Sequence, residues 1–158
     1  MSRAFVREND GAEVPEDVPE RPVSAHPNFV TARGLHHIED RVHALEHERE
    51  DAKRDEDKVA LTRIDRDLRY WLVRKSSAKV VEPDPSPRQV RFGVRVSLRY
   101  DSGEERVFTL VGEDEADPAH GLISWISPIA QALIGAQAGD EVKLQGQNAE
   151  ILRLESGT

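Results

Sequence analysis

Two histidines in the first half of the chain are the residues whose types and spacing most directly suggest chemistry. His43 and His47 are four positions apart, so they share one face if the segment is helical. Together with Glu39 or Glu50, these imidazoles form a set that suits a transition metal. The alternative is a solvated helix face, because no motif fixes a third ligand. The sequence therefore predicts no intrinsic metal site.

Independent catalysis finds little support in the residue types. The chain contains no cysteine, which excludes disulfides, thiolate nucleophiles and cysteine metal sites. No Ser-His-Asp arrangement, phosphate-binding glycine loop or zinc motif is recognisable. We therefore expect a protein that is not an enzyme and has no cofactor of its own.

The histidines belong to a segment whose apolar residues recur every three or four positions, as on one side of a helix. A second stripe follows a charged run from Glu48 to Lys58, and folding back at that run lets each stripe cover the other. Thr31 is the expected N-cap of the first helix, and a surface ion pair is expected between Asp65 and Arg69. The two stripes comprise Leu35, Ile38, Val42 and Leu45, then Leu61, Ile64, Leu68 and Trp71.

Composition limits the classes of protein that the chain can belong to. Its 158 residues are 33% charged and 37% hydrophobic, which allows a modest core in one or two small domains. No window is apolar enough to span a membrane and no secretory signal is visible, so we expect a cytoplasmic protein. A net charge of -8 opposes direct nucleic-acid binding, because phosphate contacts need a basic surface.

Four segments are predicted along the chain. Residues 1–30 contain four prolines among acidic residues and are expected to form a flexible or draped arm, with Phe5 and Phe29 as its anchors. Residues 31–80 form the helical hairpin. A proline-rich linker covers 81–89.

The fourth segment, residues 90–158, is a β-rich domain. From Val90 to Tyr100 apolar and polar residues alternate, which predicts a strand with one buried face, Phe92 included. A hairpin partner is expected to end at Val111, and Gly121 to Ile126 is expected to add a third strand. Ser127-Pro128 is typical of a helix start. The chain is therefore predicted to be α+β, with a small antiparallel sheet packed on one short helix.

The C-terminal segment resembles a known family. Val111 to Pro118, Gly121-Leu122-Ile123-Ser124 and Gly139-Asp140-Glu141-Val142 look like the C-terminal domain of the GreA/GreB transcript cleavage factors. The resemblance extends over roughly residues 32–154. It implies an antiparallel coiled-coil hairpin followed by an FKBP-like domain. It also implies that a monomer binds RNA polymerase at the secondary channel, without sequence-specific contact to nucleic acid or membrane.

The same resemblance implies two sets of functional residues. The hairpin tip of that family supplies carboxylates that share Mg²⁺ with the polymerase active site, so that the polymerase cleaves its own backtracked RNA. The tip candidates in this chain are Asp51, Asp55, Glu56 and Asp57. The docking candidates are Asp114, Glu115, Asp117, Pro118, Ser127 and Pro128.

Two alternative functions follow, one because the hairpin tip departs from the family's sequence and one because of the predicted fold. The tip lacks the family's Gly-Asp and Glu-Asn pairs and holds Lys53, Arg54 and Lys58, as expected for a polymerase-binding regulator without cleavage stimulation, similar to Rnk-type regulators. The FKBP-like fold also raises peptidyl-prolyl isomerase activity. That activity needs an aromatic apolar pocket, and the predicted alternation already places Phe92 and Tyr100 in the core.

Overall fold

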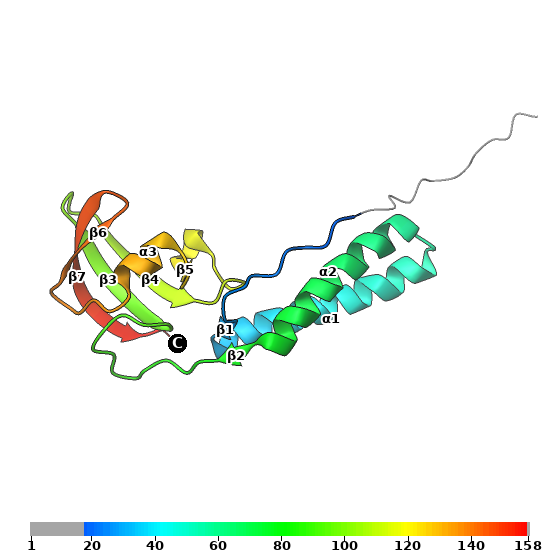
Figure 1. Ribbon diagram of the computed structural model, residues 1–158, viewed down its shortest axis with the longest axis horizontal. Helices are drawn as coiled ribbons and strands as arrows, with labels where there is room; N and C mark the ends of the chain where they lie inside the picture. Colours follow the sequence, from blue (N-terminus) through cyan, green and yellow to red (C-terminus); the bar gives the residue numbers. More distant parts are fainter. Residues whose placement is uncertain (1–17, 158) are drawn as a thin grey trace, which may run out of the picture.

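The structure, a computed structural model, describes residues 18–157 and consists of a helical rod attached to a small sheet domain (Figure 1). The rod is formed by α1 (Ala32–Arg54) and α2 (Lys58–Ser77), which run antiparallel. The expected anchor Phe5 lies outside the described residues. Within the described residues, no helix is long and apolar enough to cross a membrane.

Local capping explains where the two helices begin and end. The Thr31 side chain accepts a hydrogen bond from the Gly34 N–H at 2.9 Å, which confirms Thr31 as the N-cap of α1. The Asp57 carboxylate accepts from the Ala60 N–H at 3.0 Å and begins α2. Between the helices, Glu56 takes a left-handed conformation with φ of 54°. The tip is therefore a tight turn of three residues.

A single apolar seam joins the helices, as the two predicted stripes require. Ile38, Val42 and Leu45 of α1 are buried against Ile64 and Trp71 of α2. The remaining members of the stripes are partly buried and pack on the same cluster: Leu35, Leu61 and Leu68. Each stripe therefore covers most of the apolar surface of the other, which holds the two helices together along the rod.

The predicted pair between Asp65 and Arg69 is wrong. Asp65 instead accepts a hydrogen bond from Arg49 of α1 at 2.6 Å, and Arg69 pairs with Glu20. Facing helices and the chain segment beside α2 supply closer partners than the next turn of the same helix. The first of these pairs adds a polar cross-link at the edge of the seam.

The sheet domain is a five-stranded sheet with the order β5-β4-β3-β7-β6. One short helix, α3 (Pro128–Leu133), covers it, and the core contains Val96, Leu98, Leu110 and Ile151. The antiparallel pairing predicted for the sheet is found at every contact except that of β5, which pairs parallel to β4. The strands are β3 (Val94–Tyr100), β4 (Glu105–Val111), β5 (Leu122–Ser124), β6 (Glu141–Leu144) and β7 (Gln147–Ser156), and a short 3-10 helix η1 (Pro118–His120) precedes β5.

Two features of this domain differ from the sequence prediction. The first strand begins at Val94, because Arg91 to Gly93 form a turn in which Gly93 has φ of 82°. Phe92 therefore leaves the alternation. Its ring lies half-buried, 6.1 Å from that of Phe29, instead of inside the sheet core.

A two-stranded parallel pair closes the base of the hairpin. β1 (Phe29–Val30) enters α1, and β2 (Lys79–Val80) leaves α2, with Phe29 opposite Lys79. The Lys79 N–H donates to the Asn28 carbonyl at 2.8 Å, and the Val81 N–H donates to the Val30 carbonyl at 2.9 Å. The chain therefore enters and leaves the hairpin at one fixed point.

The seam generates a stability prediction. Leu45→Ala removes a side chain that is 2% exposed, so it should lower the free energy of unfolding by about 2–5 kcal/mol. Leu72→Ala, the same substitution at a position of α2 that is 44% exposed, should cost less than about 0.5 kcal/mol. Urea unfolding of both variants measures the difference. Equal losses would contradict the seam.

Candidate functional site

The hairpin tip separates its four predicted acidic residues into two kinds. Asp51 lies in the last turn of α1, where it pairs with Arg54 at 3.2 Å and with His47 at 3.9 Å. Asp57 is the N-cap of α2. Both carboxylates already interact with neighbouring groups and stabilise the turn.

Asp55 and Glu56 are the tip carboxylates without such partners. Both side chains are exposed, and within residues 18–157 neither forms a salt bridge or a side-chain hydrogen bond. The left-handed backbone at Glu56 places this residue at the apex between the helices. Asp55 and Glu56 are thus two adjacent, exposed carboxylates at the end of the rod.

The helix-face histidines do not assemble a metal centre in the described part of the chain. His36 lies 3.5 Å from Glu39, and His47 contacts Asp51 as noted above. No group of three or more His, Asp or Glu side chains among the described residues is arranged to hold a metal ion. The geometry therefore gives His43 and His47 no third ligand there.

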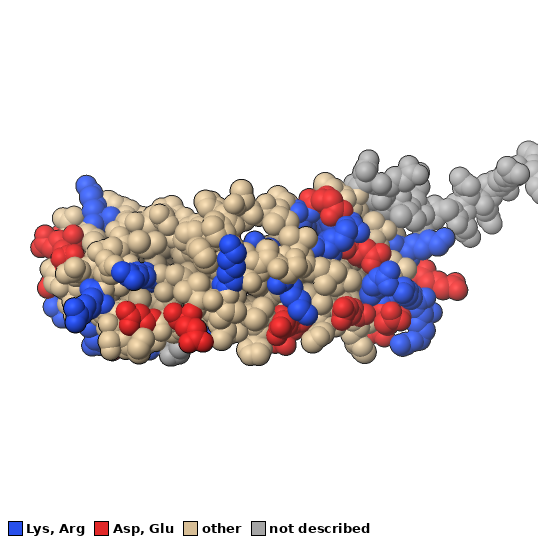
Figure 2. Space-filling view, turned by 60° about the horizontal axis from the view of Figure 1, so that its bottom comes forward, with Lys and Arg blue, Asp and Glu red and all other residues tan. Residues whose placement is uncertain are grey.

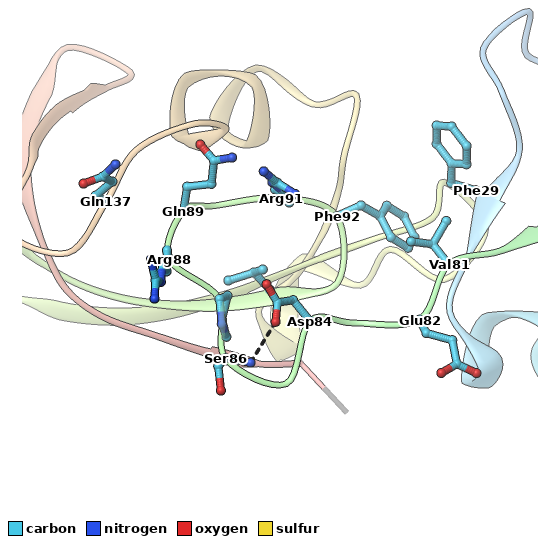
Figure 3. A pocket seen from close by; sticks show the side chains of 12 residues that line it. Phe29, Val81, Glu82, Asp84, Ser86, Arg88, Gln89, Arg91, Phe92 and Gln137 are labelled. Carbon is cyan, nitrogen blue, oxygen red and sulfur yellow. Dashed lines mark hydrogen bonds between the residues drawn. The ribbon is translucent and has the colours of Figure 1, made fainter.

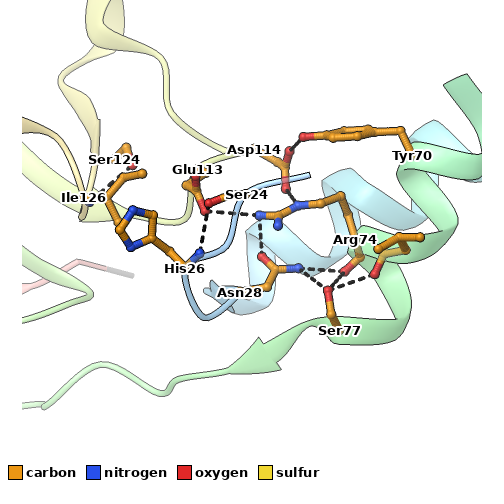
Figure 4. Close-up of polar contacts among 11 residues, drawn as sticks. Ser24, His26, Asn28, Tyr70, Arg74, Ser77, Glu113, Asp114, Ser124 and Ile126 are labelled. Atoms are coloured by element: carbon orange, nitrogen blue, oxygen red, sulfur yellow. Dashed lines mark hydrogen bonds and ion pairs between the residues drawn. The ribbon is translucent and has the colours of Figure 1, made fainter. Parts of the chain in front are cut away.

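The most developed polar arrangement lies at the joint between the rod and the sheet domain, around Arg74 of α2 (Figure 4). The Arg74 side chain is 2% exposed. Its Nε donates to Asp114 Oδ2 at 2.6 Å, and its Nη2 donates to Asn28 Oδ1 at 2.8 Å. Glu113 adds a longer ion pair at 3.5 Å. The buried guanidinium is thus compensated by two carboxylates and an amide.

Tyr70, one turn before Arg74, completes this network. Its hydroxyl donates to Asp114 Oδ1 at 2.7 Å, so that both oxygens of Asp114 accept bonds from α2. Burial raises the pKa of Tyr70 to about 12, and the hydrogen bond to the Asp114 carboxylate acts in the same direction. We call Arg74, Tyr70, Asp114 and Asn28 the latch.

Glu115 forms a second contact across the joint. Its Oε2 accepts a hydrogen bond from Thr31 Oγ1 at 2.6 Å, and Arg33 lies 3.9 Å from the other oxygen. The same carboxylate approaches Gly34 so closely that an added Cβ would lie 2.8 Å from Oε2. A side chain at Gly34 would therefore displace the Glu115 carboxylate from its contact with Thr31.

The predicted docking residues consequently divide between the joint and the surface. Asp114 and Glu115 are inside the joint, with side chains only 7% exposed, whereas the Asp117 side chain is 48% exposed. Asp117 Oδ2 lies 2.6 Å from Nδ1 of the His120 ring, and Pro118 begins η1 beside it. The Asp114 and Glu115 carboxylates thus already accept hydrogen bonds from other residues of the same chain.

Ser127 and Pro128 begin α3 as the sequence predicts. Ser127 Oγ accepts from the Ala130 N–H at 3.3 Å, and Pro128 occupies the first turn with its ring exposed. β5 contacts both η1 and α3, so Pro118 and Pro128 lie along the same end of the sheet domain. An accessible patch therefore includes Asp117, Pro118 and Pro128.

A cavity of about 830 Å³ lies between the linker and the two domains (Figure 3). Phe29 and Phe92 form its apolar end, while Arg88 and Gln137 lie at the other. Asp84, at its rim, accepts a hydrogen bond from the Ser86 N–H at 2.9 Å. The acidic and basic side chains do not gather into one charged cluster.

Charged side chains are concentrated away from the joint. Figure 2 shows blue and red groups interleaved over the distal part of the hairpin and again at the far end of the sheet domain. Fewer charged groups cover the surface between them. Neither sign forms an extended patch on this face.

These features define a two-part α+β protein, in which polar side chains hold a rod on a sheet domain. Residues 85–155 match the family model for the C-terminal domain of the transcription elongation factors GreA/GreB. This part of the chain is therefore similar to the C-terminal domain of the GreA/GreB family.

Individual transcription elongation factors are similar to part of this chain. Transcription elongation factor GreB of Yersinia pestis is 46% identical over 94 residues, which cover 59% of this chain and 55% of that protein. GreB of Neisseria meningitidis serogroup B is 42% identical over 104 residues, covering 62% and 64%. The chain thus spans between half and two thirds of the length of these relatives. A GreA/GreB structure from Nitrosomonas europaea aligns at 22% identity over 80% of this chain and 98% of that one, with a TM-score of 0.41.

The latch generates a pH prediction. Because the pKa of Tyr70 is raised above its ordinary value of 10.0 to about 12, the neutral phenol favours the folded state. This contribution to stability should be complete below pH 10 and should be lost as pH rises through 12. Tyrosinate absorbance should show a late step near pH 12 that disappears in Tyr70→Phe. In Asp114→Asn the step should move to lower pH, and an unmoved step would contradict the role of Asp114.

Proposed function

We propose that this protein is a transcription elongation factor that binds RNA polymerase at the secondary channel and regulates elongation by inserting its hairpin. The observation that carries the proposal is a GreA/GreB C-terminal domain with a narrow rod fixed at its edge by the latch. α1 has 23 residues, so the rod reaches about 35 Å. Such a rod matches a partner with a deep, narrow entrance. The protein itself performs no catalysis.

The sheet domain supplies the docking surface in this proposal. Asp114 and Glu115 support it indirectly, because their carboxylates hold the rod at the edge of the domain. Asp117, Pro118 and Pro128 remain accessible at one end of that domain. An acidic side chain at an interface rim steers association with a basic partner surface and makes binding sensitive to salt.

The tip favours regulation as the first function and leaves cleavage stimulation as a second candidate. Lys53, Arg54 and Lys58 surround the turn, and Asp51 is paired with one of them. These cations weaken a shared metal site. The observation that favours the second candidate is the exposed pair Asp55 and Glu56, whose oxygens suit Mg²⁺ held by the polymerase.

A cleavage assay on a backtracked elongation complex separates the two candidates. If the tip supplies metal ligands, the parent protein should accelerate cleavage, and Asp55→Ala with Glu56→Ala should abolish that acceleration. Asp51→Asn, which changes an adjacent carboxylate that is already paired, should keep it. Binding of the double variant to polymerase should be unchanged. A parent protein that binds but does not accelerate cleavage would exclude the second candidate and leave the regulator.

The docking surface is tested by charge reversal. Asp117→Lys should weaken binding to RNA polymerase by about tenfold, equivalent to about 1.4 kcal/mol, with the loss greatest at low salt. Asp101→Lys places the same change in the exposed turn between β3 and β4 and should bind like the parent. Equal affinity for all three proteins, measured by surface plasmon resonance, would remove Asp117 from the interface.

A further inference from the structure

The angle between the rod and the sheet domain is not set by a shared apolar core. The buried apolar cluster of the hairpin and that of the sheet domain have no residue in common. A cavity of about 480 Å³ separates the two parts and is lined by Arg33 of α1, Val80 of β2 and Arg95 of β3. Because protein cores are otherwise packed tightly, this gap leaves the angle to a small number of specific contacts.

The segment before α1, residues 18–30, crosses this joint, and we call it the arm. In Figure 1 the arm runs beside α2 toward the base of the hairpin, where it becomes β1. Glu20 pairs with Arg69 of α2, with Oε1 and Oε2 both 3.1 Å from the Arg69 Nε. Arg21 lies 3.6 Å from Asp67. These two ion pairs attach the arm to α2 at Asp67 and Arg69.

The arm also holds the latch residues themselves. The Arg21 guanidinium stacks 3.9 Å from the centre of the Tyr70 ring, whose hydroxyl bonds to Asp114. Asn28, which is buried, donates to the Arg74 carbonyl at 2.7 Å and to Ser77 Oγ at 3.2 Å. The side-chain oxygen of Asn28 accepts a hydrogen bond from the Arg74 guanidinium. The orientation of both α2 side chains that reach Asp114 thus depends on the arm.

At its other end the arm contacts the sheet domain through aromatic rings. The Phe29 ring lies 5.2 Å from that of Trp125 and 6.1 Å from that of Phe92. His26 meets Trp125 edge-on at 6.0 Å. Gly112 approaches the Phe29 carbonyl so closely that an added Cβ would lie 2.5 Å from the oxygen. Phe29 therefore supplies the apolar contact between the two parts that their separate cores do not provide.

We propose that the arm is a brace that fixes the direction of the hairpin relative to the sheet domain. It binds α2 at one end, the sheet domain at the other, and the latch in between. With the arm in place the hairpin points in one direction. Without residues 1–27 the hairpin still folds, because Ile38, Val42 and Leu45 remain packed against α2, but it samples a range of directions.

The test measures a distance across the joint in the free protein, so its result does not depend on RNA polymerase. The chain has no cysteine, which allows Val59→Cys near the tip and Val107→Cys on β4, both exposed, to carry a spin label each. Pulsed electron spin resonance then gives the distribution of tip-to-sheet distances. The parent should give one narrow distribution, and deletion of residues 1–27 should broaden it and shift its mean.

Two further proteins make the outcome unambiguous. Arg21→Ala with Phe29→Ala removes the contacts at both ends of the brace without shortening the chain, and it should broaden the distribution. This variant tests the proposal even if the deletion does not fold. Arg49→Ala breaks an ion pair of similar exposure that lies wholly within the hairpin, and should leave the distribution narrow. Narrow, parent-like distributions in the deletion and the double variant would overturn the proposal. Lower thermal stability with an unchanged distance would also overturn it, because the arm would then only cover surface.

Discussion

The buried charge of Arg74 is the constraint on which the arrangement of this molecule depends. A guanidinium removed from water is costly unless it is paired and hydrogen-bonded, and deleting one partner of such a pair costs about 3–5 kcal/mol. Asp114 and Asn28 meet that requirement, one from the sheet domain and one from the arm. The requirement can be satisfied only when rod, arm and sheet domain come together. One cation therefore selects a single relative placement of three segments that are distant in sequence.

This constraint changes how the acidic loop after β4 is understood. A loop rich in Asp and Glu on an acidic protein suggests a surface for a basic partner. Here two of its carboxylates face inward to Arg74 and Thr31, and their charge is used within the molecule. The carboxylates that remain accessible lie farther along the loop, such as that of Asp117. Composition alone does not distinguish these two uses of the same residue type.

Periodic features of the structure were predictable from sequence, and non-local ones were not. The stripe spacing predicts the hairpin because burial on one face leaves a local signature, and Thr31 and Ser127 predict caps for the same reason. Arg74 has no such signature. In the sequence Arg74 resembles any other charged residue of a helix. Its burial depends on Asp114, which lies 40 positions away. The β1–β2 pair and the parallel placement of β5 are likewise set by tertiary contacts, since such short strands carry almost no pattern.

The parallel pairing of β1 with β2 has a consequence for how this protein can diversify. Because the chain enters and leaves the rod side by side, the residues between Val30 and Lys79 form a unit whose two ends are held together by the β1–β2 pair. Matched insertions of whole helical turns in α1 and α2 would lengthen the rod by about 5.4 Å per turn and would leave the β1–β2 pair unchanged. The length of the rod and the contacts at its base can therefore evolve separately.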